Sequence, residues 1–285
     1  MCDSGGEEIS MKQMSMQASR TWLDAPGRQH GYIPVGDEVE IFAAAWESGL
    51  SVMLKGPTGC GKTRLVEHMA NQLGVPLFTV SCHEDMTASD LLGRFVLRES
   101  NTEWVDGPLT RAVREGGICY LDEVVEARQD AVVAVHSLAD HRRELNIERL
   151  GGVKIHAAEG FQLVVSYNPG YQSVLKDLKM STRQRLVGID LGFPPPDVER
   201  KVLRQETGLD GPIVDDIIKL GEAIRRLDDP GLREAASTRT LVATASLVQA
   251  GLSPRTAAVS AIASSLSDDE DTQERLTVLI ESYLQ

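Results

Sequence analysis

Short apolar runs alternate with amphipathic stretches over the first two thirds of the chain. The amphipathic stretches repeat apolar residues every three or four positions, as at Leu65, Val66 and Met69, and this spacing predicts helices. Short apolar runs bounded by turn signals predict buried strands. The predicted strands are residues 51–55, 77–81, 117–121, 161–166 and 186–191. Strands that alternate with helices predict an α/β fold, here with a five-stranded parallel sheet.

The strands stop after Pro194-Pro195-Pro196, which is the clearest linker in the chain. Helical periodicity continues from there to the C-terminus. The helices predicted in this part are residues 198–207, 213–227, 237–250, 254–266 and 271–284. We therefore predict three parts: a flexible N-terminal segment (1–30), an α/β core (31–193) and an all-helical domain (194–285).

Two stretches are predicted to form β-hairpins inserted into this core. The first covers residues 94–106, turns at Ser100-Asn101 and interrupts a helix that resumes at Pro108. The second covers residues 145–156 and has a strong turn signal in Gly151-Gly152. A hairpin inside a helix has little structural use, so the first is either a working loop or plain packing.

Three helices are expected from local signals within the core. Asp37 is expected to cap the first, since Glu40 follows three residues later and completes a capping box. The others are expected at residues 127–140 and 175–180.

The first predicted strand ends in a G-x-x-x-x-G-K-T sequence, and a predicted helix follows at once. Glycines let the backbone wrap closely around a polyphosphate at a helix N-terminus. Lys62 can reach the terminal phosphates, and the Thr63 hydroxyl can ligate Mg²⁺. The predicted nucleotide-binding residues are Gly56, Pro57, Thr58, Gly59, Cys60, Gly61, Lys62, Thr63 and Arg64. The alternative, a glycine-rich turn, does not explain the strand before it and the helix after it.

The third predicted strand runs straight into Asp122 and Glu123. Both carboxylates then lie at the carboxyl edge of the sheet, where ligands bind in open α/β folds. Asp122 is positioned to hold the Mg²⁺ hydration shell and Glu123 to deprotonate the attacking water. The alternative for this pair is a helix N-cap. Asn168 follows the fourth strand and could contact the γ-phosphate or the water, although Asn-Pro is also a common turn.

Three arginines have two readings each. Arg183 and Arg185 lie two residues apart, and such arginines are usually solvated at the surface. At a subunit boundary, one of them could instead reach a neighbour's γ-phosphate. Arg239 could turn back to the nucleotide or simply be exposed on its helix.

Composition narrows the function further. The net charge of −13 argues against nucleic acid as the main partner. Apolar runs are too short to span a membrane. Four scattered cysteines without a C-x-x-C pair favour a cytoplasmic location. No histidine spacing is typical of a metal site, so the expected cofactors are ATP and its Mg²⁺.

Together these motifs resemble the AAA+ ATPases, and the two hairpins resemble the helix-2 insert and pre-sensor hairpin of the MoxR branch. The stretches 54–64, 106–116, 119–128 and 166–172 are similar to the CbbQ/NorQ group. The resemblance implies that residues 56–63 are the Walker A loop and that Asp122 and Glu123 are the Walker B acids. It further implies that Asn168 is sensor 1 and Arg239 sensor 2.

The resemblance also implies partners. Such proteins form homo-hexameric rings in which an arginine finger crosses the interface; Arg185, directly before an apolar strand, fits that position better than Arg183. They act with a von Willebrand factor A-domain protein that recruits the client. The expected client is Rubisco blocked by inhibitory sugar phosphates, and the alternative is nitric oxide reductase, which needs non-haem iron inserted. A nucleotide-gated assembly switch and a DNA-acting protein are the competing functions, opposed by Glu123 and by the net charge respectively.

Overall fold

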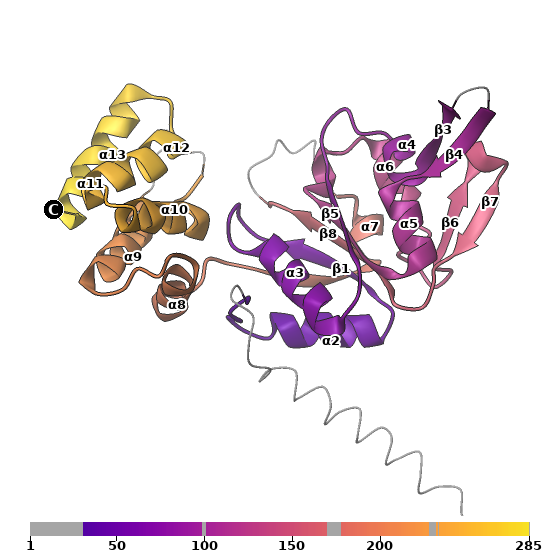
Figure 1. Cartoon of the computed structure of the whole chain (residues 1–285), viewed down its shortest axis with the longest axis horizontal. Coiled ribbons are helices and arrows are strands. Elements are labelled where there is room, and N and C mark those ends of the chain that lie inside the picture. Colours follow the sequence, from indigo (N-terminus) through magenta and orange to yellow (C-terminus); the bar gives the residue numbers. More distant parts are fainter. Residues whose placement is uncertain (1–30, 99–100, 170–177, 228–231, 233, 285) are drawn as a thin grey trace, which may run out of the picture. The chain divides into compact units, whose positions relative to one another are not determined.

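The computed structural model describes residues 31–98, 101–169, 178–227, 232 and 234–284. Five parallel strands form its central sheet (Figure 1). Their order is β2 (Leu77–Ser81), β5 (Gly117–Asp122), β8 (Phe161–Tyr167), β1 (Ser51–Lys55) and β9 (Leu186–Asp190). This confirms the predicted α/β fold and five-stranded parallel sheet. The predicted N-terminal segment, 1–30, lies outside the described residues.

Helices cover both faces of the sheet because side chains alternate along buried strands. On one face, α2 (Glu38–Glu47) and α3 (Lys62–Leu73) pack against strand residues such as Leu54 and Tyr120. On the other, α4 (Ala88–Leu92), α5 (Pro108–Glu115) and α6 (Gln129–Ala134) pack on a cluster that includes Cys119 and Leu121. Successive residues of β5 therefore serve opposite faces.

Both predicted hairpins form. In the first, β3 (Gly93–Arg98) pairs with β4 (Asn101–Asp106), and it lies between α4 and α5 as expected. In the second, β6 (Glu144–Ile147) and a 3₁₀ turn (Glu148–Leu150) lead to β7 (Val153–His156). Gly151 and Gly152 both have positive φ, at 72° and 75°, so this turn needs glycine.

The C-terminal helices build a separate apolar cluster, which includes Leu203, Ile217 and Ile280. Its helices are α8 (Pro196–Thr207), α9 (Pro212–Arg225), α10 (Thr238–Gln249), α11 (Pro254–Ala258), a π-helical turn (Val259–Ala263), α12 (Ser264–Leu266) and α13 (Glu270–Tyr283). The predicted helices are confirmed, while the exact boundary at residues 193 and 194 stays a prediction. Among the described residues, no helix is long and apolar enough to cross a membrane.

The predicted capping box at Asp37 is wrong. Asp37 makes no side-chain cap bond. Glu38, the first residue of α2, binds the preceding chain instead: its carboxylate accepts hydrogen bonds from the backbone N–H groups of Val35 and Gly36 and from the hydroxyl of Tyr32. A carboxylate placed there satisfies N–H groups that the approaching chain would otherwise leave free.

The helix expected over residues 127–140 is shorter than predicted, since α6 covers only Gln129–Ala134. Tertiary hydrogen bonds hold the following residues in turns. The Ser137 hydroxyl donates to the Glu144 carbonyl, and His136 Nε2 lies 2.8 Å from Thr182 Oγ1. The helix expected at 175–180 lies mostly outside the described residues, and α7 (Met180–Arg183) begins where it was expected to end.

Candidate nucleotide-binding site

The predicted phosphate-binding loop joins β1 to α3. Gly59 and Gly61 have φ of 71° and 103°, a region that other residues seldom adopt. Gly56 is required by close packing: a Cβ there would lie 2.2 Å from the Leu191 carbonyl oxygen. The loop's shape therefore depends on its glycines.

The Lys62 ammonium group lies within this loop. It donates to the carbonyls of Gly56 and Pro57 at 2.8 and 2.9 Å, and to Asn168 Oδ1 at 2.6 Å. Asn168 also donates from Nδ2 to Thr58 Oγ1 at 3.0 Å. The structure thus brings Asn168, which directly follows β8, into contact with the loop after β1. Its predicted contact with the γ-phosphate or the water stays a prediction.

Asp122 ends β5 beside a group of hydroxyls. Its Oδ1 accepts the hydroxyls of Tyr120 and Ser166, each at 2.6 Å. The Tyr120 oxygen also lies 3.4 Å from Thr63 Oγ1. Oxygen atoms of Thr63 and Asp122, one from each side of Tyr120, therefore come together at the sheet edge.

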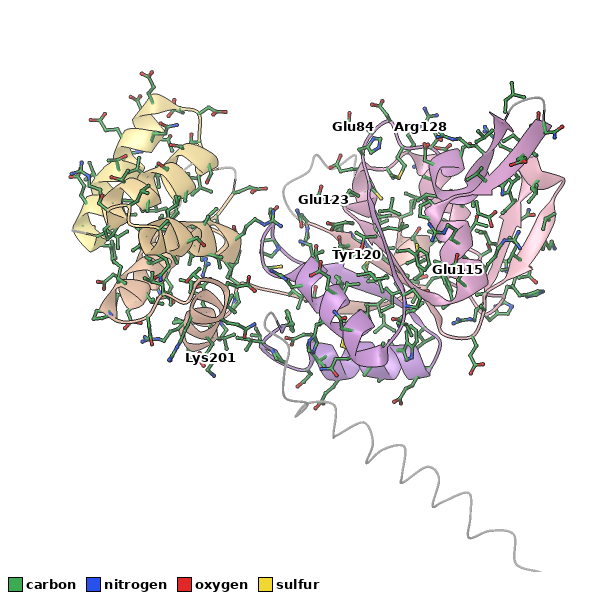
Figure 2. The ribbon with its side chains drawn as sticks, in the orientation of Figure 1. Glu84, Glu115, Tyr120, Glu123, Arg128 and Lys201 are labelled. Carbon is green, nitrogen blue, oxygen red and sulfur yellow. The ribbon has the colours of Figure 1, made fainter. Side chains whose placement is uncertain are left out.

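Glu123 follows in a left-handed conformation, with φ 55° and ψ 46°. Such a backbone is costly for a residue with a side chain and often occurs at functional sites. The Ser166 hydroxyl oxygen accepts the Glu123 N–H at 3.1 Å and so supports this turn. The Glu123 side chain is exposed, and Figure 2 shows it at the edge of the sheet, beyond the buried Tyr120.

Two pKa shifts reflect this crowding. Desolvation, followed by the charge of Asp122, raises the pKa of Glu123, and Lys62 opposes the shift. Burial lowers the pKa of Lys62, against the attraction of Cys60, Asp122 and Glu123. A carboxylate with a raised pKa is a better proton acceptor, which suits the role predicted for Glu123.

The donor set fits a magnesium nucleotide. Hydroxyl and carboxylate oxygens are the ligands that Mg²⁺ prefers, and Thr63 and Asp122 supply one of each. The glycine loop, the N-terminus of α3 and the Lys62 ammonium group form a site suited to phosphates. Glu123 does not act as a helix cap, because its side chain makes no cap bond to the turn that follows.

Residues of the helical part also contact the loop. A Cβ on Gly59 would lie 2.6 Å from the Ser237 Cβ and 3.2 Å from the Arg239 Cβ. Arg239 is exposed, and its charge acts on Lys62. Arg64 instead makes an ion pair with Glu206 at 3.1 Å.

Comparison with known proteins agrees with these motifs. Residues 51–186 match the model of the AAA domain (dynein-related subfamily), and residues 199–283 match that of the CbbQ/NirQ/NorQ C-terminal region. The denitrification regulatory protein NirQ of Stutzerimonas stutzeri is 54% identical over 241 residues, which cover 85% of this chain and 87% of the relative. The chain belongs to the CbbQ/NirQ/NorQ family of AAA ATPases.

Relatives with different names in this family are about equally similar. Protein NorQ of Paracoccus denitrificans is 52% identical and protein CbbQ of Hydrogenophilus thermoluteolus 50%, covering 89% and 86% of this chain and 92% and 91% of the relatives. A crystal structure of a protein described as an ATPase from Cytophaga hutchinsonii has a TM-score of 0.55 at 18% identity, and the match covers 96% of this chain and 89% of that one. The last comparison shows the fold alone.

In this family member the two candidate finger arginines differ in exposure. Arg183 lies on α7, half-buried, with its guanidinium 5.4 Å from the centre of the Tyr167 ring. Arg185 is exposed and donates to the Ser181 carbonyl. Arg183 is thus held against its own core, whereas Arg185 lies at the surface.

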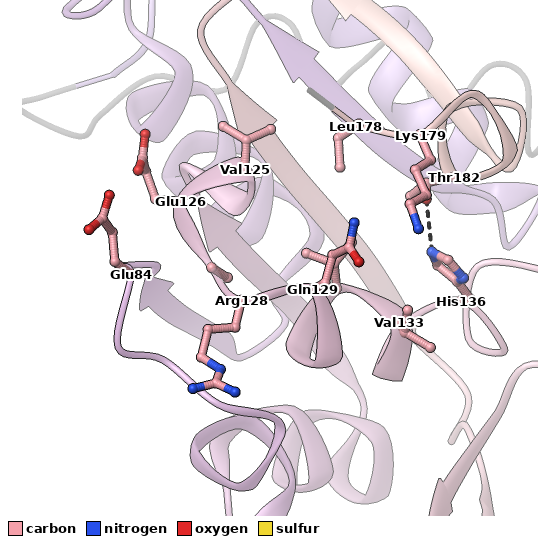
Figure 3. A pocket seen from close by; sticks show the side chains of 12 residues that line it. Glu84, Val125, Glu126, Arg128, Gln129, Val133, His136, Leu178, Lys179 and Thr182 are labelled. Atoms are coloured by element: carbon pink, nitrogen blue, oxygen red, sulfur yellow. Dashed lines mark hydrogen bonds between the residues drawn. The ribbon is translucent and has the colours of Figure 1, made fainter. Parts of the chain in front are cut away.

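A cavity of about 420 Å³ lies beside the residues that follow Glu123 in the chain, and no residue of the phosphate-binding loop lines it. Figure 3 shows its lining side chains. Residues Val125 to Gln129 line one side, and Lys179 and Thr182 line another. Its wall includes the charged side chains of Glu84, Glu126, Arg128 and Lys179. This mixed lining does not define one kind of ligand.

Sequence reasoning missed Tyr120 and Ser166. A signal was present, because side chains two apart on a strand share a face. Tyr120 therefore lies on the face of Asp122, and Ser166 on that of Asn168. Pairing of Leu121 with Val165 then places Asp122 next to Ser166.

Proposed function

We propose that this protein is a cytoplasmic ATPase that uses hydrolysis to remodel a client enzyme. The observation that carries the proposal is the meeting of Lys62, Asn168, Asp122 and Glu123 at one edge of the sheet. A phosphate-binding loop alone would serve a switch equally well. A carboxylate poised to activate water is what hydrolysis requires in addition.

Each residue has a distinct part in the proposed reaction. Lys62 and the backbone of residues 56–63 bind the phosphates, while Thr63 and Asp122 would hold Mg²⁺. When bound, Mg²⁺ neutralises charge on the phosphate oxygens. Glu123 accepts the proton of the attacking water.

Asn168 is suited to orient the water or the γ-phosphate, because its amide already lies on Lys62 and Thr58. Arg239 from α10 and Arg64 beside the loop would hold the nucleotide from the lid side.

A homo-hexameric ring would complete this site. The exposed Arg185 is the better candidate for an arginine finger, since a surface guanidinium can reach a neighbouring subunit and Arg183 is stacked on Tyr167. The first hairpin supports a contact role, because Phe95 is 52% exposed and Leu97 72%. Exposed apolar side chains on a hairpin favour protein contacts.

The proposed partner is a von Willebrand factor A-domain protein that brings the client to the ring. The proposed client is Rubisco, from which remodelling would release tight-binding sugar phosphates. Nitric oxide reductase is the second candidate. It is favoured by the name of the NirQ relatives, which are denitrification regulatory proteins at 54% and 52% identity.

Carboxylase recovery of inhibitor-locked Rubisco tests the proposal. The assay contains this protein, its von Willebrand partner, ATP and Rubisco from the same source, with Glu123→Gln as the matched control. Recovery that needs both ATP and Glu123 would support Rubisco activation. ATP hydrolysis without recovery would favour nitric oxide reductase, tested next by iron content and activity of the reductase.

A nucleotide-gated assembly switch is the competing class. It predicts slow turnover that Glu123→Gln leaves unchanged. A DNA-acting protein predicts salt-sensitive DNA binding, which a net charge of −13 opposes.

A further inference from the structure

Tyr120 occupies an unusual place for a large aromatic residue. Its side chain is completely buried among the apolar residues under α3, yet its hydroxyl lies between Thr63 and Asp122. A buried phenol needs a hydrogen-bond partner. Here two of its three partners are the residues predicted to hold Mg²⁺, and the third is the Ser166 hydroxyl at 3.2 Å. This ties the inference to the proposed ATPase function.

Counting hydrogens fixes the direction of the bonds around Tyr120. Asp122 as a carboxylate can only accept, and the Glu123 N–H can only donate. Tyr120 and Ser166 each have one hydroxyl hydrogen, and each lies 2.6 Å from Asp122 Oδ1. The Tyr120 and Ser166 hydroxyl oxygens also lie 3.2 Å from each other. Because their contacts to Asp122 Oδ1 are much shorter, we assign both hydrogens to Asp122.

The contact between Thr63 and Tyr120 must then run one way. Since the Tyr120 hydrogen points to Asp122, Thr63 is the donor and Tyr120 the acceptor across their 3.4 Å separation. This is longer than a strong O–H···O bond. It still directs the Thr63 hydrogen toward β5, which leaves the Thr63 oxygen lone pairs available to a cation.

The same counting applies on the other side. Ser166 accepts the Glu123 N–H at 3.1 Å and donates to Asp122. Two ordered chains, Thr63 to Tyr120 to Asp122 and Glu123 to Ser166 to Asp122, thus meet on one carboxylate oxygen.

We propose that Tyr120 is a positioning residue. Its hydroxyl accepts a hydrogen bond from Thr63 and donates one to Asp122, and so orients both residues toward a shared divalent cation. Ser166 is its counterpart toward Glu123, and orients Asp122 while holding the backbone of the water-activating residue. Outer partners of this kind commonly change metal affinity ten- to a hundredfold when removed.

The test is the Mg²⁺ dependence of nucleotide binding by the full chain, followed with a fluorescent ADP. Tyr120→Phe keeps the buried ring and removes only the hydroxyl. It should raise the Mg²⁺ concentration for half-maximal binding about tenfold or more. Metal-free ADP binding should stay close to wild type, because Lys62 and the glycine loop are unchanged.

Ser166→Ala separates the two chains. It should also raise the Mg²⁺ concentration for half-maximal binding. In addition, it should lower the turnover at saturating Mg²⁺, because the Glu123 backbone loses its hydrogen bond to Ser166. Matched controls are Tyr283→Phe on α13 and Ser246→Ala on α10, whose hydroxyl donates within its own helix. Neither should move the Mg²⁺ dependence.

The outcomes are distinct. The role of Tyr120 would be overturned if wild type and Tyr120→Phe reached half-maximal ADP binding at the same Mg²⁺ concentration. That result would leave the proposed ATPase function intact. An equal shift in Tyr283→Phe would likewise overturn it, as a general stability effect. Wild-type protein that binds no nucleotide with Mg²⁺ would overturn both proposals.

Discussion

Two carboxylates, Asp122 and Glu199, are surrounded in opposite ways. Glu199 on α8 is completely buried. It accepts hydrogen bonds from both terminal nitrogens of Arg225, at 2.7 and 3.0 Å, and from the Thr238 hydroxyl at 2.7 Å. Asp122 on β5 instead accepts two hydroxyls. One carboxylate has a guanidinium partner built into the chain, and the other has neutral donors.

This difference separates a structural from a functional use of the same charge. The charge of Glu199 is balanced within the helical cluster, where Arg225 also lies over the Phe193 ring and donates to the Ala236 carbonyl. It joins α8 to α9 and to the start of α10. Hydroxyls orient Asp122 without neutralising it, which keeps its charge for a cation.

The arginines divide in the same way into structural and functional ones, and the largest expected loss of activity is that of Arg185→Ala. Arg225 is paired, whereas Arg185 is exposed at the surface. As the proposed arginine finger, Arg185 acts on the transition state, so Arg185→Ala should lower ATP hydrolysis by the proposed ring about a thousandfold or more and leave nucleotide binding intact. Steady-state hydrolysis and a binding titration measure this. A larger loss in Arg183→Ala than in Arg185→Ala would show that Arg183 is the finger.

Glu123→Gln should bind ATP normally and lower turnover by about a hundredfold to ten-thousandfold, the usual contribution of a general base. Single-turnover phosphate release measures the chemical step. Glu126→Gln is the matched control from the same loop and should retain most turnover. Full activity in Glu123→Gln would remove Glu123 as the base.

Glu199→Gln should destabilise the protein by about 3–5 kcal/mol, because it leaves the Arg225 charge buried without its partner. Urea unfolding of the full chain measures this. Glu222→Gln on α9 removes the surface pair with Arg226, whose guanidinium is exposed, and should cost less than about 1 kcal/mol. Equal losses in the two variants would contradict a structural role for Glu199.

The smallest effect concerns pH. Glu123 must be deprotonated to act, and its pKa is raised, so hydrolysis should fall at a higher pH than an ordinary glutamate would allow. Glu126 is one of the charges that raise it. Glu126→Gln should therefore move the acid limb of the turnover profile to lower pH. An unmoved limb would show that another group controls it.

The sequence predicted what depends on local patterns. The fold class was predicted from the periodicity of strands and helices. Most of the candidate site was predicted from the glycine loop and the acids after β5, because each of these signals lies within a few residues. Tyr120 and Ser166 were missed because their roles depend on which strands are neighbours. Local rules also failed at two places. The Asp37 side chain makes no cap bond, and α6 ends at Ala134, beyond which Ser137 bonds to the distant Glu144 carbonyl.

The most direct measurement is the unfolding free energy of Asp122→Asn with and without Mg²⁺ and ATP. Asparagine keeps an oxygen for the Tyr120 and Ser166 hydroxyls, so without nucleotide the change should be under about 1 kcal/mol. Wild type should gain about 2.7 kcal/mol at a hundred times the dissociation constant, and the variant should gain much less. A variant that loses as much stability as Glu199→Gln, yet keeps the full gain from Mg²⁺ and ATP, would show that Asp122 serves the fold and not the ligand.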